Sequence, residues 1–283
     1  MTATQPDIAV VVMAYGLRPT LAGAVRSLQT QGCAAEIVVV HSGPGDAAAY
    51  FAAHGVDVRV VSAAGRLYPG GARNQGIAAT SAPVVAFLAD DCHATPGWIA
   101  ARLKAHGSGA RAVASALLSH RPHRPVALAA HLSLFIRRMP LTPPDLALCY
   151  GASYARELFA RYGLFRDDME GGEDTEFHQR LAPEDAPVWC PAVQTIHHGE
   201  ERLGAYLRDQ SRRGRRMAEA WRAIGTRTSR DVARNALRRT TFIISQSRTV
   251  ARDHRLTRLM ALPLIVAGNV CYAWGALRAN RTS

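Results

Sequence analysis

Short apolar runs and stretches with helical periodicity alternate along the first third of the chain. A short continuous apolar run is typical of a strand that is buried on both faces of a parallel sheet. We therefore predict strands at residues 8–13, 36–40, 56–61 and 83–88. The repeated order of strand and helix predicts an α/β fold with a doubly wound, mostly parallel sheet that is flanked by helices.

Helices are predicted between and after these strands. Thr20 is placed to cap a helix with Leu21, Ala24, Val25 and Leu28 on one face. Residues 72–79 have a helical pattern, and Thr95-Pro96 is suited to the start of another helix. Residues 110–200 are mixed, whereas the chain from residue 201 is helical in pattern and rich in arginine. The pattern predicts an α/β domain at 1–200 and a helical C-terminal region at 201–283.

One C-terminal stretch is long and apolar enough to be a candidate membrane segment. Leu259–Leu277 contains 19 residues without a charge between Arg258 and Arg278. As a helix it would be about 28 Å long, close to the ~30 Å hydrocarbon core of a bilayer. Four residues interrupt it: Pro263, Gly268, Asn269 and Gly275. The stretch is therefore either a buried core helix or an interfacial or re-entrant membrane segment, and a full membrane span is less favoured.

The composition narrows the choice of partner and compartment. Lys and Arg number 34 against 22 Asp and Glu, a net charge of +12. This excess reflects either a biased base composition or an anionic partner such as phosphate, nucleic acid or a membrane surface. The five cysteines are scattered, which favours reduced thiols in the cytoplasm over disulfides or a zinc site. Residues 1–7 carry no signal peptide pattern.

Ligands of such sheets bind beyond the carboxyl ends of the strands. The polar residues directly after the predicted strands are therefore the candidate site residues. Asp90 and Asp91 come directly after the fourth strand. Mg²⁺ binds one or two carboxylates together with substrate phosphates. These acids therefore suit a metal site, and the alternative is a helix cap or a solvated loop.

Two later segments add acids and imidazoles. Glu173 and Asp174 follow two glycines at the start of a predicted helix, where the helix dipole keeps a carboxylate ionised. Such a group suits a general base, and the alternative is ordinary capping. His197 and His198 suit contacts to a metal or a diphosphate, and the alternative is a surface position.

Several of these segments, in this order, resemble those of the family 2 glycosyltransferases with a GT-A fold. The resemblance runs from about residue 8 to 220. It is carried by the strand ending in Ala14-Tyr15, the strand ending in His41-Ser42-Gly43, and three further segments around Arg73-Asn74, Asp90-Asp91 and Glu173-Asp174.

The resemblance implies that residues 1–200 are the nucleotide-sugar-binding and catalytic domain, and it implies a role for each site residue. Asp91 would hold Mg²⁺ or Mn²⁺ on the diphosphate of a nucleotide-sugar donor, with His197 completing these contacts. Asp174 would deprotonate an acceptor hydroxyl for inverting transfer, and Glu173 would shape that site. The remaining residues would line the nucleotide: Ala14, Tyr15, His41, Arg73, Asn74 and, near the ribose, Asp90.

Two positions depart from the family pattern. His41 stands where an aspartate usually contacts the nucleobase. The sequence therefore does not determine which nucleobase the donor carries. Ala89 stands where the first acid of the Asp-x-Asp segment is expected, which lowers the expected affinity for metal.

We expect a metal-dependent inverting glycosyltransferase at the cytoplasmic face of an anionic membrane. Its expected acceptor is a lipid-linked or cell-envelope glycan, and no specific nucleic acid is expected. One alternative is a catalytically degenerate basic scaffold that binds membrane or nucleic acid. A nucleotidyltransferase is a second alternative, and a dinucleotide-dependent dehydrogenase is disfavoured because no Gly-x-Gly-x-x-Gly follows the first strand.

Overall fold

A computed structural model of the chain describes residues 6–151, 153–225 and 228–279. The chain forms two compact units. Unit 1 consists of Met1–Ala116, Leu148–Met169 and Glu173–His197, and unit 2 consists of Leu117–Ala147, Glu170–Gly172 and His198–Ser283. This grouping differs from a division at residue 200, because residues 117–147 belong with the C-terminal helices.

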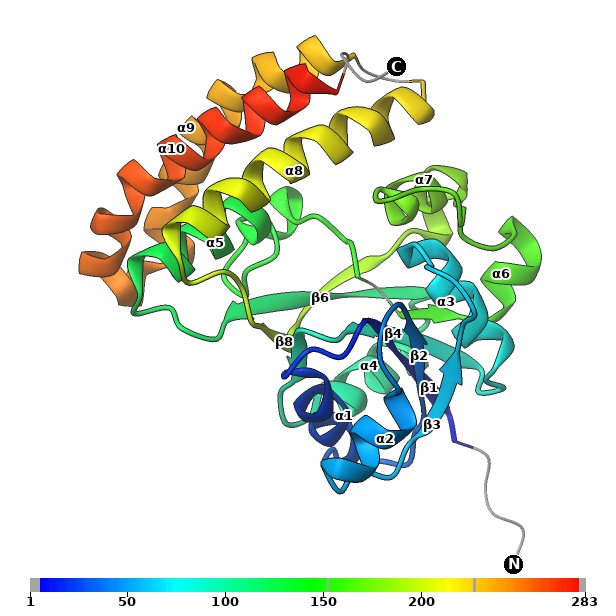
Figure 1. Cartoon of the computed structure of the whole chain (residues 1–283). Coiled ribbons are helices and arrows are strands. Elements are labelled where there is room, and N and C mark those ends of the chain that lie inside the picture. Colours follow the sequence, from blue (N-terminus) through cyan, green and yellow to red (C-terminus); the bar gives the residue numbers. More distant parts are fainter. Residues whose placement is uncertain (1–5, 152, 226–227, 280–283) are drawn as a thin grey trace, which may run out of the picture. The chain divides into compact units, whose positions relative to one another are not determined.

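The described residues contain one mixed sheet of eight strands in the order β3-β2-β1-β4-β7-β6-β8-β5 (Figure 1). Strands β3, β2, β1 and β4 are parallel neighbours, whereas the pairs β4–β7, β7–β6 and β5–β8 are antiparallel. The predicted α/β fold is confirmed. The strands are β1 Ile8–Tyr15, β2 Glu36–Ser42, β3 Arg59–Ser62, β4 Val84–Ala89, β5 Cys92–Ala94, β6 Ala112–Ser119, β7 Ser153–Ala155 and β8 Val188–His197.

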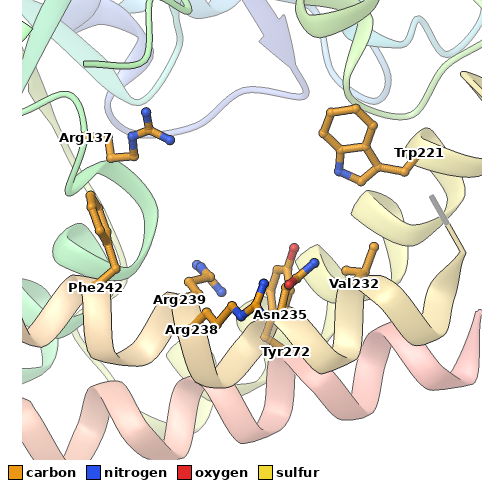
Figure 2. A pocket seen from close by; sticks show the side chains of 8 residues that line it. All are labelled: Arg137, Trp221, Val232, Asn235, Arg238, Arg239, Phe242 and Tyr272. Atoms are coloured by element: carbon orange, nitrogen blue, oxygen red, sulfur yellow. The ribbon is translucent and has the colours of Figure 1, made fainter. Parts of the chain in front are cut away.

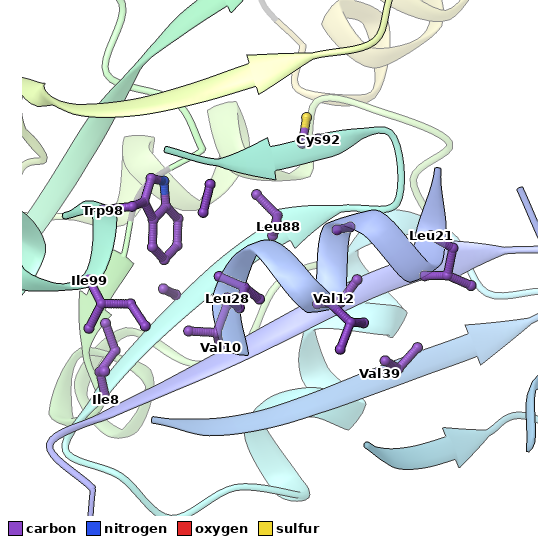
Figure 3. Packing of buried hydrophobic residues seen from close by; sticks show 14 of the residues in the cluster. Ile8, Val10, Val12, Leu21, Leu28, Val39, Leu88, Cys92, Trp98 and Ile99 are labelled. Atoms are coloured by element: carbon purple, nitrogen blue, oxygen red, sulfur yellow. The ribbon is translucent and has the colours of Figure 1, made fainter. Parts of the chain in front are cut away.

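Both faces of β1, β2 and β4 are largely buried, which explains their continuous apolar runs, whereas the edge strand β3 is partly exposed. Val10 and Val12 of β1 belong to one core cluster, and Val11 between them belongs to another. The first cluster includes residues of α1 Leu21–Gln29, α2 Ala47–Ala53 and α4 Trp98–Gly107 (Figure 3). The second includes residues of α3 Pro69–Ala78, α6 Glu157–Tyr162 and α7 Glu173–Arg180.

Two predicted helix caps are wrong in detail. Thr20 precedes α1, but its side chain makes no capping hydrogen bond. Gly97, with a φ of 82°, is the residue that precedes α4, and the Thr95 hydroxyl instead donates to the carbonyl of Gln194 at 2.8 Å. At Thr95, a contact with a distant strand decides what the hydroxyl binds.

Unit 2 is helical among its described residues, apart from the end of β6. Its helices are α5 Pro125–Phe135, α8 Leu203–Ala223, α9 Ser229–Val250 and α10 Arg255–Arg278, with short 3-10 turns at Pro144–Leu146 and Arg252–His254. Thr228 and Asp231 form a reciprocal capping box at the start of α9.

Close packing between α8 and α10 explains the small residues in the apolar stretch. A Cβ on Gly275 would lie 1.9 Å from the carbonyl oxygen of Ser211, and one on Gly268 would lie 2.0 Å from the hydroxyl of Tyr206. Asn269 is buried and donates to the carbonyl of Ile265 at 3.0 Å. These residues therefore form the face of α10 that packs within unit 2.

The opposite side of α10 carries exposed apolar side chains. Residues Arg252–Arg278 are the one candidate found in the described part of the chain that is long and apolar enough to cross a membrane, and a third of its most apolar window is buried. The exposed side chains recur at intervals of three to four residues for much of the helix, as expected for one face. They are Leu256, Leu259, Met260, Val266, Val270, Trp274 and Leu277.

Candidate functional site

The acid pair forms the whole link between two strands at the carboxyl edge of the parallel sheet. β4 ends at Ala89, Asp90 and Asp91 follow, and β5 begins at Cys92. The guanidinium of Arg18 contacts both acids, with Nε 3.5 Å from Asp90 Oδ2 and Nη1 3.2 Å from Asp91 Oδ2. Burial raises the pKa of the Asp90 carboxyl to about 6, against the opposing effect of Arg18.

His197 comes to the acid pair through strand pairing. It is opposite Cys92 in the antiparallel register of β5 and β8. Its Nε2 lies 3.9 Å from Asp91 Oδ2. Residues more than a hundred positions apart in the chain therefore meet at one edge of the sheet.

The spacing of Asp91 and His197 is compatible with a shared divalent cation. Two ligand atoms that each lie about 2.1 Å from one ion are at most about 4.2 Å apart. No group of three or more His, Cys, Asp or Glu residues suited to a metal is found within the described parts of the chain. A metal held here would therefore need oxygen ligands from a phosphate or from water in addition.

An aromatic and arginine cluster lies beside the acid pair. The backbone N–H of Tyr15 is hydrogen bonded to the Asp90 carboxylate, and the half-exposed Tyr15 ring lies close to Gly43. The guanidinium of Arg66 lies 5.2 Å from the Tyr15 ring centroid and 5.1 Å from that of Tyr68. This open, flat and cationic surface suits a nucleobase or a phosphate.

His41 is buried at the end of β2, next to β1. Its backbone pairs with Ala14 in the parallel register, and its side chain shares the strand face of Val39. His41 is 3% exposed, and its Nε2 has no hydrogen-bond partner among the described residues. A polar atom that is buried in this way favours a partner that the chain itself does not supply.

A second cluster joins α3 to α7. Arg73 and Glu173, both buried, form an ion pair through Nη1 and Oε1. The guanidinium also lies 5.0 Å from the Phe165 ring centroid and 5.5 Å from that of Phe87. Burial alone would lower the pKa of Arg73, but the negative charges of Glu173 and Asp174 raise it above its ordinary value.

Asn74 and Asp174 have different surroundings in this second cluster. The Asn74 amide donates to the Phe165 carbonyl at 2.8 Å and accepts from the Phe165 N–H at 3.1 Å. It therefore fixes the segment that leads to α7. Asp174 is partly exposed in the first turn of α7 and accepts from the N–H of Thr175 at 2.8 Å.

The sequence profile described as "Glycosyl transferase family 2" matches residues 9–153. This match covers β1 through the start of β7 and includes the acid pair, Tyr15, His41 and Arg73. The chain belongs to glycosyl transferase family 2. It is therefore a glycosyl-transferring enzyme, and no curated protein sequence matches it.

Solved structures of glycosyltransferases share the fold of this family 2 chain. A mannosyltransferase from Pyrobaculum calidifontis, in complex with GDP-Man and Mn²⁺, has 16% sequence identity and a TM-score of 0.63, covering 98% of this chain and 87% of that one. TarS 1-349 from S. aureus, in complex with UDP-GlcNAc, has 11% identity and a TM-score of 0.54, covering 97% and 92%. A mycobacterial protein has 20% identity and a TM-score of 0.52, covering 80% and 77%.

The predicted site residues of this family 2 enzyme fall into two groups. The first surrounds Asp90, Asp91 and His197, and the second surrounds Arg73 and Glu173, with Asp174 beside them. Sequence reasoning missed Arg18, Arg66 and Tyr68, which contribute to the first group. Their position in loops after β1 and β3 was the signal that could have identified Arg18, Arg66 and Tyr68.

Proposed function

We propose that the chain catalyses metal-dependent inverting transfer of a sugar from a nucleotide-sugar donor to an acceptor hydroxyl. The observation that carries this proposal is the meeting of Asp90, Asp91 and His197 at the carboxyl edge of the sheet. The complexes of structural relatives with GDP-Man and Mn²⁺ and with UDP-GlcNAc also support it. The proposed acceptor is a lipid-linked or cell-envelope glycan.

The donor is proposed to bind across the first group of residues. Tyr15 offers a ring face to the base, Arg66 lies beside that ring, and His41 offers a buried nitrogen. Asp91 and His197 would hold Mg²⁺ or Mn²⁺. When bound, the ion would supply positive charge that stabilises the departing nucleoside diphosphate.

Arg18 takes part in the proposed donor site as a movable cation. Its side chain is 56% exposed while it contacts both acids. It can therefore move from the carboxylates to the diphosphate when a metal neutralises the acids. A guanidinium in this position offsets the charge that develops on the leaving group.

Asp174 is proposed as the general base. The partly exposed carboxylate accepts the proton of the acceptor hydroxyl, and the oxygen attacks the anomeric carbon as the bond to the diphosphate breaks. Asp174 lies in the first turn of α7, and its negative charge interacts with the positive charge of Arg73. Glu173 holds Arg73 in place through the buried ion pair.

Attachment to an anionic membrane is proposed for unit 2. The exposed apolar side chains of α10 suit the interfacial region of a bilayer. Exposed arginines at the ends of this helix, Arg255 and Arg278, suit anionic headgroups. The proposed place of action is the cytoplasmic face of the cell membrane.

A thermal unfolding screen of nucleoside diphosphates, each with and without Mn²⁺, tests the proposed donor site. A ligand at 100 times its Kd is expected to stabilise the protein by about 2.7 kcal/mol. The Asp91→Asn variant should lose the part of this stabilisation that depends on metal. Asp46→Asn, which removes an exposed acid from the cap of α2, is the control. A metal response that is equal in both variants would contradict the assignment of Asp91.

Vesicle sedimentation tests the proposed attachment. Binding to vesicles with anionic lipid should fall in the double variant Val270→Ser with Trp274→Ser, because both side chains are exposed on α10. Leu164→Ser, which removes an exposed apolar side chain from unit 1, is the control. Unchanged vesicle binding in the α10 variant would exclude this face as the attachment surface.

A further inference from the structure

A cavity of about 360 Å³ lies within unit 2, and none of its lining residues belongs to the proposed donor site (Figure 2). Its lining comes from α8, α9, α10 and the segment after α5. Three arginines point into it: Arg137, Arg238 and Arg239. Aromatic side chains form much of the rest of the lining: Trp221, Phe242 and Tyr272.

None of the three arginines has a carboxylate partner among the described residues. Arg137 donates from Nε to the Leu146 carbonyl at 2.6 Å. Arg239 donates to Asn269 Oδ1 at 2.9 Å and to the Ser133 carbonyl. Arg238 is exposed and has no ion pair within the described parts of the chain. Their hydrogen bonds are therefore to neutral oxygens, and the positive charge of the cavity is uncompensated.

Other arginines of the same helices do have acidic partners. Arg213 and Arg215 of α8 pair with Asp209 and Glu219 in the adjacent turn. Arg234, one turn before Arg238 on α9, pairs with Asp231. The absence of acids is thus a property of the cavity lining and not of these helices in general.

Burial destabilises the positive charge of Arg239. Burial lowers the pKa of its guanidinium, because removal from water disfavours the charged form. The Tyr272 ring, with its centroid 4.2 Å from Cζ, offsets part of this effect by a cation–π interaction. A bound anion would offset it further, since a buried charge is stabilised by pairing.

The shape and chemistry of the lining indicate the class of anion. The planar guanidinium group matches phosphate oxygens in a bidentate way, and several arginines can share one phosphate. Because a water-sized group takes about 30 Å³, the five heavy atoms of a phosphate fill less than half of the cavity. The aromatic lining would cover an apolar substituent in the remaining space.

We propose that this cavity binds a phosphate ester with an apolar organic group, at a site separate from the donor site. The phosphate would contact the guanidinium groups of Arg137, Arg238 and Arg239, and the organic group would lie against Trp221 and Phe242. The source of the phosphate is either a lipid or a small soluble ester, because both present the same chemistry. The proposal does not depend on the sugar-transfer reaction.

Isothermal titration of the full chain with octyl phosphate, inorganic phosphate and octanol tests the proposal. Octyl phosphate should bind more tightly than either of the other two. Arg238→Gln should weaken its binding by about tenfold or more, as expected for loss of one charge-assisted contact. Arg238 is exposed and unpaired among the described residues, so this variant should keep its fold.

Arg248→Gln is the matched control, because Arg248 is also an exposed arginine of α9 but does not line the cavity. Equal loss of binding in the two variants, or equal binding of octanol and octyl phosphate, would overturn the phosphate site. No detectable binding of octyl phosphate would overturn it as well. Equal binding of inorganic and octyl phosphate would overturn the apolar part and leave free phosphate as the ligand. Vesicles with a phosphate monoester lipid then separate the two sources, because only a lipid site gives vesicle binding that is lost in Arg238→Gln.

Discussion

The two units differ most clearly in how far acidic residues balance the charge of their arginines. Unit 2 contains 22 of the Arg and Lys residues against 8 Asp and Glu, a net charge of +14, whereas unit 1 has 12 against 14, a net charge of −2. In unit 1, Arg18 and Arg73 contact carboxylates of the candidate site. In unit 2, the arginines of the cavity have no such partner among the described residues.

This difference separates two ways of binding phosphate. The acids of unit 1 bind cations, so a phosphate reaches them through a metal or through an arginine that leaves its partner. The arginines of unit 2 can bind an anion directly.

Asp174→Asn is expected to reduce the rate of sugar transfer by about 10²- to 10⁴-fold, because removal of a general base has effects of this size. The Kd for the donor nucleotide should stay unchanged, since Asp174 is proposed to act on the acceptor. Single-turnover kinetics and titration with nucleotide measure the two quantities. Asp167→Asn, at an exposed acid of the segment before α7, is the control. Full turnover in Asp174→Asn would remove this residue from the mechanism.

Arg73→Met is expected to lower the free energy of unfolding by about 3–5 kcal/mol, because Glu173 would be left as a buried charge without a partner. Arg234→Met in unit 2 breaks an exposed pair with Asp231 and should lower it by at most about 1 kcal/mol. Urea unfolding measures both. Similar losses in the two variants would show that burial does not distinguish these ion pairs.

Gly275→Ala is expected to lower the free energy of unfolding by about 1–3 kcal/mol, since the added methyl group overlaps the Ser211 carbonyl and separates α8 from α10. Gly107→Ala in unit 1 places a methyl group in open space at the end of α4 and should have little effect. Thermal unfolding compares the two. A neutral Gly275→Ala would mean that the helix pair can separate without loss of packing.

His106→Gln is expected to reduce the dependence of stability on pH. Burial lowers the pKa of His106 to about 4, so the folded chain holds the imidazole neutral. The unfolded chain takes up this proton at a higher pH, and stability is lost as the pH falls from about 6.5 toward 4. The variant should lose less stability than the wild type over that range in urea unfolding. His123→Gln, at an exposed histidine of unit 2, should keep the wild-type dependence.

The parts of the fold that the sequence predicts well are those decided by local pattern. The strand at Ile8–Tyr15 has apolar residues at every position because α1 and α3 cover its two faces, and such a run is recognisable. Thr95 was misassigned as a cap because its partner, Gln194, lies on a strand far along the chain. A contact between residues so far apart in the chain cannot be predicted from the local sequence pattern.

The candidate site shows the same limit. Asp90 and Asp91 could be identified because they follow a strand, and the position of a strand end is a local property. Two other contacts depend on how distant segments fold together. Arg18 contacts both of these acids, and Asn74 binds the backbone of Phe165. The glycines of the apolar stretch are likewise visible in the sequence, but the packing of Gly268 and Gly275 against α8 is not.

The two-residue connection between β4 and β5 has a consequence for how this enzyme can vary. Since Cys92 is opposite His197, the separation of acid and imidazole is set by a backbone ladder and not by a flexible loop. A slip of one position along that ladder would turn His197 to the other side of the sheet. Insertions at this turn are therefore expected to be far less tolerated than insertions in surface loops elsewhere in the chain.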